Sequence, residues 1–437
     1  MHQDIVFESS GRSLRPTSET GDCGFFFSTR SHLDAGLYIA RFQLLLPRTV
    51  VPPPDAFIAF EVVTWEGDQP SFAGRSERPW DDALAQASDE ILLVFPIAAG
   101  AEVEYRCYAS HGCASVHLRA LKVKRADRGH VEDWSYTHGA SAWPLDHLRN
   151  VIIGNSSVCN ARCPHCPTSL NDNAKVPQKI MPLELHEKLV RGLVECGLPI
   201  KGQLAYGLFA EPLLDPTLLA KTQAVRQALP NQRIVVNTNG GPFNPAIHEC
   251  LLDTVTAVSV HIEAHDPVLY EALMPPLTAS RTFPRLAEIA RLWQKRAKLA
   301  VPVHARNLDQ PRRLQEWWQS LGGGEVIPLQ YSNRCSWSPA SASLLLWPAP
   351  GDCHQEVVED LIVDFDGKAL TCCHDFSRRN EIGDLQVEEV AGLMSNAARR
   401  HVYDALGRQE WNSFESCRDC LVSDVPMMRA ALAEAAE

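Results

Sequence analysis

The stretch that decides the fold is Val151-Ile-Ile-Gly-Asn-Ser-Ser-Val-Cys159-Asn-Ala-Arg-Cys163-Pro-His-Cys166. The short apolar run at its start predicts a strand, and the cysteines follow that strand in a loop. Thiolates at this spacing can reach three irons of a [4Fe–4S] cluster, which normally takes four cysteines, so one iron is left open. A structural zinc site is the alternative, although it would usually require a second cysteine or histidine pair close by.

From Leu148 onward, short apolar segments alternate with segments of helical period. Strands are predicted at 151–153, 204–208, 233–237, 255–262, 299–304 and 326–331. Helices are predicted at 185–195, 217–228, 283–298 and 309–320. This order is typical of an α/β fold with a parallel sheet, whose functional loops lie at the carboxyl ends of the strands. Six such units predict a partial (β/α)6 barrel over residues 148–345.

Residues 1–130 have a different pattern, in which short alternating strands are separated by turns rich in Pro, Gly and Asp. This pattern predicts a β-sandwich, similar to jelly-roll domains that bind carbohydrate or pack beside an enzyme core. Trp65, Trp80 and Tyr105 are candidates to stack on sugars or to fill the core. Residues 131–147 are polar and without periodicity, which predicts a linker. Residues 346–437 form a further, cysteine-containing domain.

Composition excludes several classes of function. The formal net charge of −12 argues against a nucleic-acid partner, which would call for a basic patch. No run approaches the roughly twenty apolar residues that span a bilayer, and no signal peptide is recognisable, so a cytoplasmic location without membrane contact is predicted. In that reducing compartment, the 14 cysteines indicate metal binding or catalysis rather than disulfides.

The CxxxCxxC spacing of Cys159, Cys163 and Cys166 resembles the radical S-adenosylmethionine (SAM) superfamily. The resemblance implies that the open iron chelates SAM, and that an electron from a reductant such as flavodoxin or ferredoxin cleaves SAM to a 5′-deoxyadenosyl radical. That radical removes a hydrogen atom from the substrate, so the cofactor carries the difficult chemistry. The family also places a ring near the adenine at the position of His165.

Two further motifs follow in the family's order. Residues 207–216, Gly-Leu-Phe-Ala-Glu-Pro-Leu-Leu-Asp-Pro, resemble the Gly-Gly-Glu motif that holds the SAM amino group, which implies that role for Ala210 and Glu211. The match is imperfect because Phe209 and Ala210 replace the glycines. Thr238-Asn239-Gly240 matches the turn near the SAM carboxylate and ribose.

Polar side chains alternate on the fourth predicted strand. Ser259, His261 and Glu263 are two residues apart, so they point to one face of the sheet. Ser259, His261 and Glu263 are thereby candidates for ribose or substrate contacts.

A second group of cysteines lies in the last part of the chain. The segment from Cys353 through Cys372 to Cys417-Arg-Asp-Cys420 resembles the C-terminal SPASM/twitch extension of radical SAM enzymes over residues 350–421. The resemblance implies that Cys353, Cys372, Cys417 and Cys420 hold one auxiliary [4Fe–4S] cluster, the second in the protein. Four thiolates are also a plausible zinc site. No cysteine follows Cys420, so the shorter twitch form is predicted.

The resemblance leaves the reaction open. The β-sandwich favours a sugar or oligosaccharide substrate, as in members of antibiotic pathways, and epimerisation at a carbinol carbon is the leading prediction. Epimerisation needs a hydrogen-atom donor, for which Cys335 and Cys373 are candidates, although a structural role is open for both. Without such a thiol, dehydrogenation is favoured. Modification of a ribosomal peptide, or a zinc-stabilised carbohydrate-binding protein with no catalysis, are further alternatives.

Overall fold

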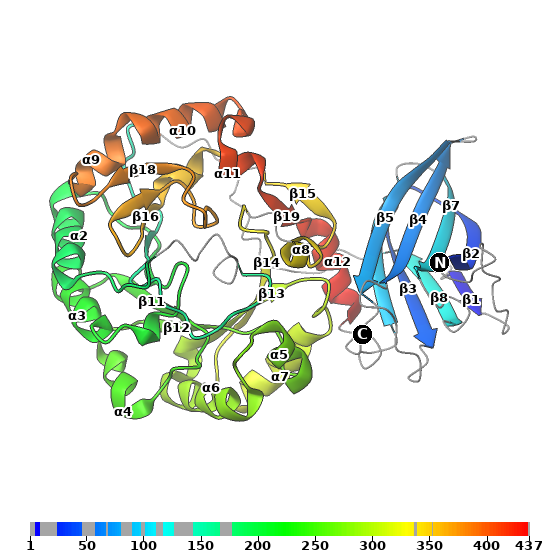
Figure 1. The fold of residues 1–437 in the computed structure, drawn as a ribbon, viewed down its shortest axis with the longest axis horizontal. Coiled ribbons are helices and arrows are strands. Elements are labelled where there is room, and N and C mark those ends of the chain that lie inside the picture. Colours follow the sequence, from blue (N-terminus) through cyan, green and yellow to red (C-terminus); the bar gives the residue numbers. More distant parts are fainter. Residues whose placement is uncertain are drawn as a thin grey trace. The chain divides into compact units, whose positions relative to one another are not determined.

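The computed structural model describes residues 5–8, 24–45, 57–66, 69–79, 90–97, 101–110, 117–125, 143–166, 177–335, 339–351 and 353–435. The chain forms two compact units (Figure 1). One consists of Met1–Val131 together with Asp424–Glu437, and the other of Glu132–Ser423. The predicted linker lies largely outside the described residues.

The larger unit is built on a mixed, mostly parallel sheet of nine strands. Its parallel strands follow chain order and are β9 (Val151–Ile153), β10 (Gln203–Tyr206), β11 (Arg233–Thr238), β12 (Ala257–His261), β13 (Ala297–Val303) and β14 (Val326–Gln330). The predicted parallel sheet is therefore confirmed. Strand β10 ends earlier than predicted, because Gly207 has a φ of 97° and turns the chain out of the sheet.

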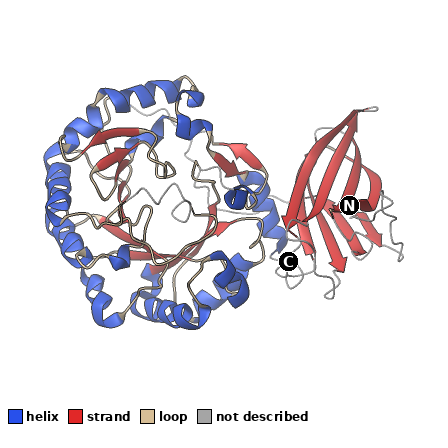
Figure 2. Ribbon diagram, viewed as in Figure 1, coloured by secondary structure: helices blue, strands red, loops and turns tan. Residues whose placement is uncertain are grey.

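Helices follow the strands and lie around the outside of the curved sheet (Figures 1 and 2). They are α2 (Leu183–Cys196), α3 (Leu218–Ala228), α4 (Pro245–His248), α5 (Pro267–Leu273), α6 (Ala279–Trp293) and α7 (Gln310–Ser320). Short 3-10 segments are η4 (Pro212–Leu214), η5 (Glu249–Asp253), η6 (Gln294–Arg296), η7 (Gln355–Glu359) and η8 (Trp411–Ser413). Helix α6 ends before the predicted 298, because Gln294 has a φ of 50° and β13 begins at Ala297.

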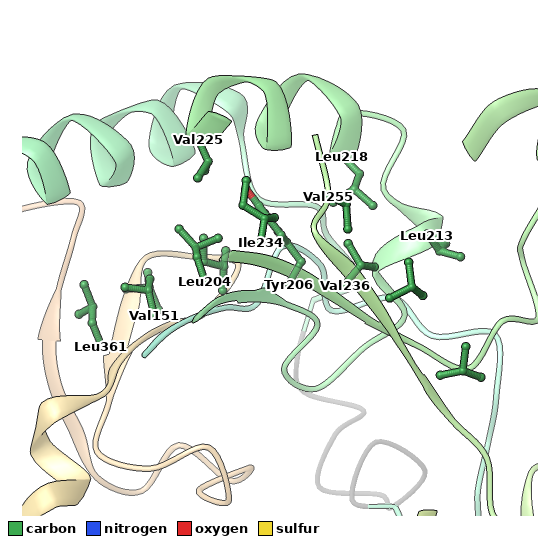
Figure 3. Packing of buried hydrophobic residues seen from close by; sticks show 14 of the residues in the cluster. Val151, Leu204, Tyr206, Leu213, Leu218, Val225, Ile234, Val236, Val255 and Leu361 are labelled. Carbon is green, nitrogen blue, oxygen red and sulfur yellow. The ribbon is translucent and has the colours of Figure 1, made fainter. Parts of the chain in front are cut away.

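Alternation along the strands divides the sheet into two chemically different faces. The helix-facing side chains form the main core, which includes Val151, Leu204, Tyr206, Ile234 and Val236 (Figure 3). The opposite face carries the small side chains Ala205, Val235 and Ala257. Because these residues are small, this concave face leaves room for polar groups on the loops at the carboxyl ends of the strands.

Residues beyond 346 extend the sheet instead of forming a separate layer. Strand β16 (Leu361–Val363) pairs parallel to β9, and β17 (Lys368–Leu370) and β18 (Glu381–Asp384) continue antiparallel. Strands β15 (Pro348–Pro350) and β19 (Leu421–Ser423) form a small antiparallel pair. The remaining helices of this unit are α8 (Pro339–Ala342), α9 (Val390–Ser395), α10 (Ala397–Gly407) and α11 (Glu415–Arg418).

The smaller unit contains two antiparallel four-stranded sheets that share one apolar core. Their orders are β1-β8-β3-β6 and β2-β7-β4-β5. The strands are β1 (Ile5–Glu8), β2 (Gly24–Leu33), β3 (Gly36–Leu45), β4 (Phe57–Glu66), β5 (Gln69–Pro79), β6 (Glu90–Ile97), β7 (Ala101–Ala109) and β8 (His117–Arg125). Helix α12 (Val425–Ala435) also belongs to this unit and contacts β6 and β3. The sequence had placed this helix with the cysteine-containing segment.

The aromatic residues of the smaller unit have different roles. Tyr105 is fully buried beside Phe95, and burial raises its pKa to about 12, so it is a core residue and is not available to stack on a sugar. Trp65 is half-buried and donates a 2.9 Å hydrogen bond to Glu104, with the Arg30 guanidinium over its ring. Trp80 lies outside the described residues. Across the described helices, none is long and apolar enough to cross a membrane.

Candidate functional site

The three cysteines of the first motif lie in the loop that leaves β9. The Cys166 amide donates to the Cys163 carbonyl at 2.9 Å, which closes a tight turn between the second and third thiols. Burial raises the pKa of Cys163, and the charges of Glu263, Cys166 and Cys159 raise it further. Burial likewise raises the pKa of Cys159 to about 11. The thiols are therefore close enough to oppose one another's ionisation, and bound iron would relieve this because it takes the deprotonated form.

In the described part of the chain, no three side chains of His, Cys, Asp or Glu are placed to hold one metal ion. The thiols of a [4Fe–4S] cluster bind different irons, so they stand farther apart than the ligands of one ion. Half-buried thiols that lie on a single loop, and that raise one another's pKa, fit such a cluster.

The loop after β10 is tied to the turn after β11 through Glu211. This buried carboxylate accepts hydrogen bonds from the Thr238 hydroxyl at 2.6 Å and from the Asn239 amide at 2.8 Å. Burial raises its pKa to about 7. The Asn239 side chain donates to Asn160 at 2.8 Å, within the cysteine loop. Three segments predicted separately therefore meet at one edge of the sheet.

Gly240 is required at this turn. Its φ is 72°, a conformation that side chains disfavour, and a Cβ there would clash with Leu286 Cδ2. Ala210 is half-buried between Phe209 and Glu211.

Glu263, a candidate from the sequence for a ribose or substrate contact, forms the centre of a buried cluster. Its two carboxylate oxygens contact His165 Nε2 at 2.8 Å and His304 Nε2 at 2.9 Å. His304 Nδ1 accepts the Arg306 amide hydrogen at 3.1 Å, so His304 carries its proton on Nε2 and donates it to Glu263. Burial opposes ionisation of Glu263, yet the imidazoles outweigh it and hold the pKa of its carboxyl well below the usual range.

This cluster connects the cysteine loop to the ends of two strands. His165 lies between Cys163 and Cys166, Glu263 follows β12, and His304 follows β13. Asn307 fixes the far side, because its side-chain amide donates to the Glu263 carbonyl at 2.8 Å and its oxygen accepts the His304 amide hydrogen at 2.8 Å. Glu263 is therefore a positioning residue for His165.

Replacing Glu263 by Gln is expected to lower the free energy of unfolding by about 1–3 kcal/mol, because the new amide would face an imidazole N–H and leave buried donors unpaired. His304 cannot change its tautomer without losing the Arg306 hydrogen bond. Urea unfolding measures the effect. The control is Glu288→Gln, on the exposed pair with Arg291, where a change within about 1 kcal/mol is expected. Equal losses in both variants would contradict a special role for Glu263.

Ser259 and His261 lie on the concave face of β12, opposite in direction to the core residues Val258 and Val260. Burial lowers the pKa of His261 to about 4, and the positive charge of Arg334 contributes. His261 is thus neutral at pH 7 and lies near the loop that follows β14.

The second group of cysteines also converges. Cys335 is buried in hydrogen-bond contact with Cys420, and hydrogen bonds from Cys335 and His374 lower the pKa of Cys420. A hydrogen bond with Cys373 and burial raise the pKa of Cys372, and the charges of Cys353 and Cys335 raise it further, so these thiols lie near one another. Cys417 is near Cys420. Cys335, singled out as a hydrogen-atom donor, therefore lies among the proposed ligands of the auxiliary site.

Cys373 is in hydrogen-bond contact with Cys372 and also lies against an apolar cluster. The cluster consists of Phe209, Ile362, Leu370 and Phe376, together with Ile152 and Leu208. Ile152 belongs to the concave face of β9, because its neighbours Val151 and Ile153 face the helices. Cys373 therefore borders the interior of the sheet.

Asn333 joins the loop after β14 to the segment that carries Cys417 and Cys420. Its side-chain oxygen accepts the amide hydrogens of Cys335 and Leu421, each at 3.0 Å, and its amide donates to the Asp419 carbonyl at 2.9 Å. No local pattern predicts this role, because Asp419 and Leu421 are more than 80 residues away from Asn333.

No protein-family model matches the chain, and no curated protein matches it. Among solved structures, the chain is similar to BtrN in complex with AdoMet and 2-DOIA, at 16% identity over 62% of this chain and 92% of that one, with a TM-score of 0.42. It is similar to anSMEcpe with bound AdoMet at 13% identity over 59% of this chain and 83% of that one, with a TM-score of 0.43. It is also similar to Streptococcus suis SuiB bound to precursor peptide SuiA, at 11% identity over 63% and 71%, with a TM-score of 0.42. At these identities and TM-scores, the function of this chain rests on its own residues.

Proposed function

We propose that the chain is a radical SAM enzyme that abstracts a hydrogen atom from a sugar and epimerises a carbinol carbon. The observation that carries the proposal is the meeting of the Cys159–Cys166 loop, Glu211 and the Thr238-Asn239-Gly240 turn at the carboxyl ends of adjacent parallel strands. Ligand sites in parallel α/β sheets lie at this edge.

The residues of this edge have defined tasks in the proposal. Cys159, Cys163 and Cys166 would hold a [4Fe–4S] cluster, and Cys353, Cys372, Cys417 and Cys420 an auxiliary one. With SAM bound, the first cluster would supply one-electron cleavage of SAM to methionine and a 5′-deoxyadenosyl radical. Glu211 keeps unused lone pairs on a buried carboxylate, which suits a cationic amino group. The hydrogen bonds that it already accepts fix its orientation.

The proposed inversion needs one hydrogen atom returned to the opposite face of the substrate carbon. A thiol S–H bond breaks, a C–H bond forms, and the resulting thiyl radical takes one electron and one proton from an external reductant of the flavodoxin or ferredoxin class. Cys373 is the thiol proposed for this task, because it borders the concave face. Each candidate thiol is in hydrogen-bond contact with a proposed cluster ligand, Cys373 with Cys372 and Cys335 with Cys420. The two-sheet unit at the N-terminus is the reason to propose a sugar substrate.

Replacing Cys373 by alanine is expected to leave SAM cleavage intact while abolishing the inverted product, because the substrate radical would find no hydrogen donor. After anaerobic reconstitution and an iron count, wild-type turnover of candidate glycosides and peptides in heavy water should place one deuterium at the inverted carbon. The matched variant Cys196→Ala removes a half-buried thiol from α2 and should retain full product formation.

The same experiment identifies the alternatives. An oxidised product without deuterium would indicate a dehydrogenase. Turnover of peptides alone would indicate a peptide-modifying enzyme. A colourless protein that contains zinc and no iron would reject radical chemistry altogether.

A further inference from the structure

Two consecutive residues after β14 adopt a backbone conformation that side chains disfavour. Arg334 has a φ of 50° and Cys335 a φ of 57°. Residues other than glycine enter this left-handed region rarely, and they remain there only where the surrounding structure holds them. Other contacts must therefore stabilise this loop conformation.

Those contacts come from both sides of the loop. The Arg334 amide donates to the Ser332 hydroxyl at 3.1 Å, and the Cys335 amide donates to the Asn333 side chain at 3.0 Å. The Arg379 guanidinium donates to the Cys335 carbonyl and forms an ion pair with Asp419. The backbone is thus fixed while the Arg334 side chain takes no part in fixing it.

The Arg334 guanidinium is unusual among arginines of this region. Arg378 pairs with Asp364 and Asp366, and Arg379 with Glu415 and Asp419. Over the described ranges, by contrast, the guanidinium of half-buried Arg334 has no hydrogen bond and no ion pair.

Arg334 is close enough to residues of the concave face and of the second cysteine group for its charge to affect them. Its charge acts on His261 at the end of β12 and on Tyr331. It also acts on Cys373 and His374 in the second cysteine group. The adjacent Ser332 hydroxyl contacts His374 at 3.3 Å, and the Tyr331 ring lies 6.1 Å from the His165 ring.

The nearby carboxylates of Glu263 and Asp375 already accept hydrogen bonds from other groups. Glu263 has both oxygens bonded to imidazoles, and Asp375 accepts the amide hydrogens of Arg379 and Asn380. A guanidinium in such a place offers a planar set of donors that matches a carboxylate or phosphate.

We propose that Arg334 binds a carboxylate or phosphate group of the substrate, so that the enzyme acts on an acidic sugar such as a uronic acid or a sugar phosphate. This inference rests on the proposed function and narrows its substrate class. The carboxylate of SAM has the same chemistry and is the other possible source of the anion, so the test must separate the two.

The test compares binding of paired probes to the reconstituted, SAM-loaded enzyme by isothermal titration. The probes are methyl D-glucuronoside, D-glucose 6-phosphate and the neutral methyl D-glucoside. Wild type is expected to bind at least one acidic probe at least 10-fold more tightly than the neutral one. Arg334→Gln should lose this preference. Arg334→Lys should keep part of it, because lysine retains the positive charge but lacks the planar pair of N–H donors of a guanidinium. The control Arg312→Gln, on an exposed pair of α7, should behave as wild type.

SAM affinity, measured separately in each variant, distinguishes the sources. It should be unchanged in Arg334→Gln, and a 10-fold loss of SAM affinity without an acid preference in wild type would assign Arg334 to SAM and overturn the inference. Equal affinity for acidic and neutral probes, or no binding of the acidic ones, would also overturn it. Because the measurement is of binding, failure of SAM cleavage would count against the proposed function alone.

Discussion

Replacement of Cys163 by alanine is expected to reduce SAM cleavage below detection and to remove about four irons per chain, because a cluster held by one loop cannot keep its place with two thiolates. Cys163 is the central thiol of the loop, and its carbonyl accepts a hydrogen bond from the Cys166 amide. Anaerobic reconstitution followed by an iron count and quantification of 5′-deoxyadenosine measures both effects. The iron of the auxiliary site should remain.

The matched control is Cys250→Ala. Cys250 is an exposed thiol that donates a hydrogen bond to the Ile247 carbonyl in the same turn. Its replacement should change neither iron content nor SAM cleavage. Full SAM cleavage by the Cys163 variant would remove the central support of the proposed function, whereas loss of all iron would indicate that the two sites assemble together.

Replacement of Lys221 by methionine is expected to destabilise the larger unit by about 3–5 kcal/mol, because it leaves the carboxylate of a buried ion pair without its cation. Lys221 Nζ lies 2.6 Å from Asp215 Oδ2, and both side chains are fully buried. Asp215 also accepts the Thr217 amide hydrogen at 2.8 Å and an Asn155 hydrogen bond at 3.0 Å, so the pair fixes the segment that follows Glu211.

Thermal unfolding provides the measurement, with an expected decrease in Tm of roughly 10 °C. Lys188→Met is the control, because Lys188 pairs at 3.3 Å with Glu389, whose side chain is 63% exposed, and such pairs contribute about 0–1 kcal/mol. The double variant Asp215→Asn with Lys221→Met should recover part of the loss. Similar decreases for the Lys221 and Lys188 variants would show that the buried pair has no special weight.

The strands of the larger unit could be predicted because each is a short apolar run bounded by turn residues. Val151–Ile153 and Arg233–Thr238 are buried on the helix side and bordered by polar loops, so their period and ends are visible in the sequence. The polar loops that follow could be assigned to one edge for the same reason. Local pattern therefore decides which element a residue belongs to.

The partners within the site could not be predicted in the same way. Glu263 lies 98 residues from His165 and 41 from His304, and no local preference brings them together. The alternation of Ser259, His261 and Glu263 predicts which face of the strand these side chains share, but not which residues they contact. Likewise, the contact between Cys335 and Cys420 depends on Asn333, whose hydrogen bonds span the whole second cysteine segment.

Helix α12 has a consequence for how the polypeptide is made. It packs on β3 and β6, so the N-terminal unit is not complete until residues near 435 have left the ribosome. During translation, the two sheets lack helix α12 while nearly 300 intervening residues are synthesised, at about 5–20 residues per second. For that interval of roughly 15–60 seconds, the surface of β3 and β6 that α12 contacts is uncovered in the nascent chain, which makes this unit an expected client of ribosome-associated chaperones.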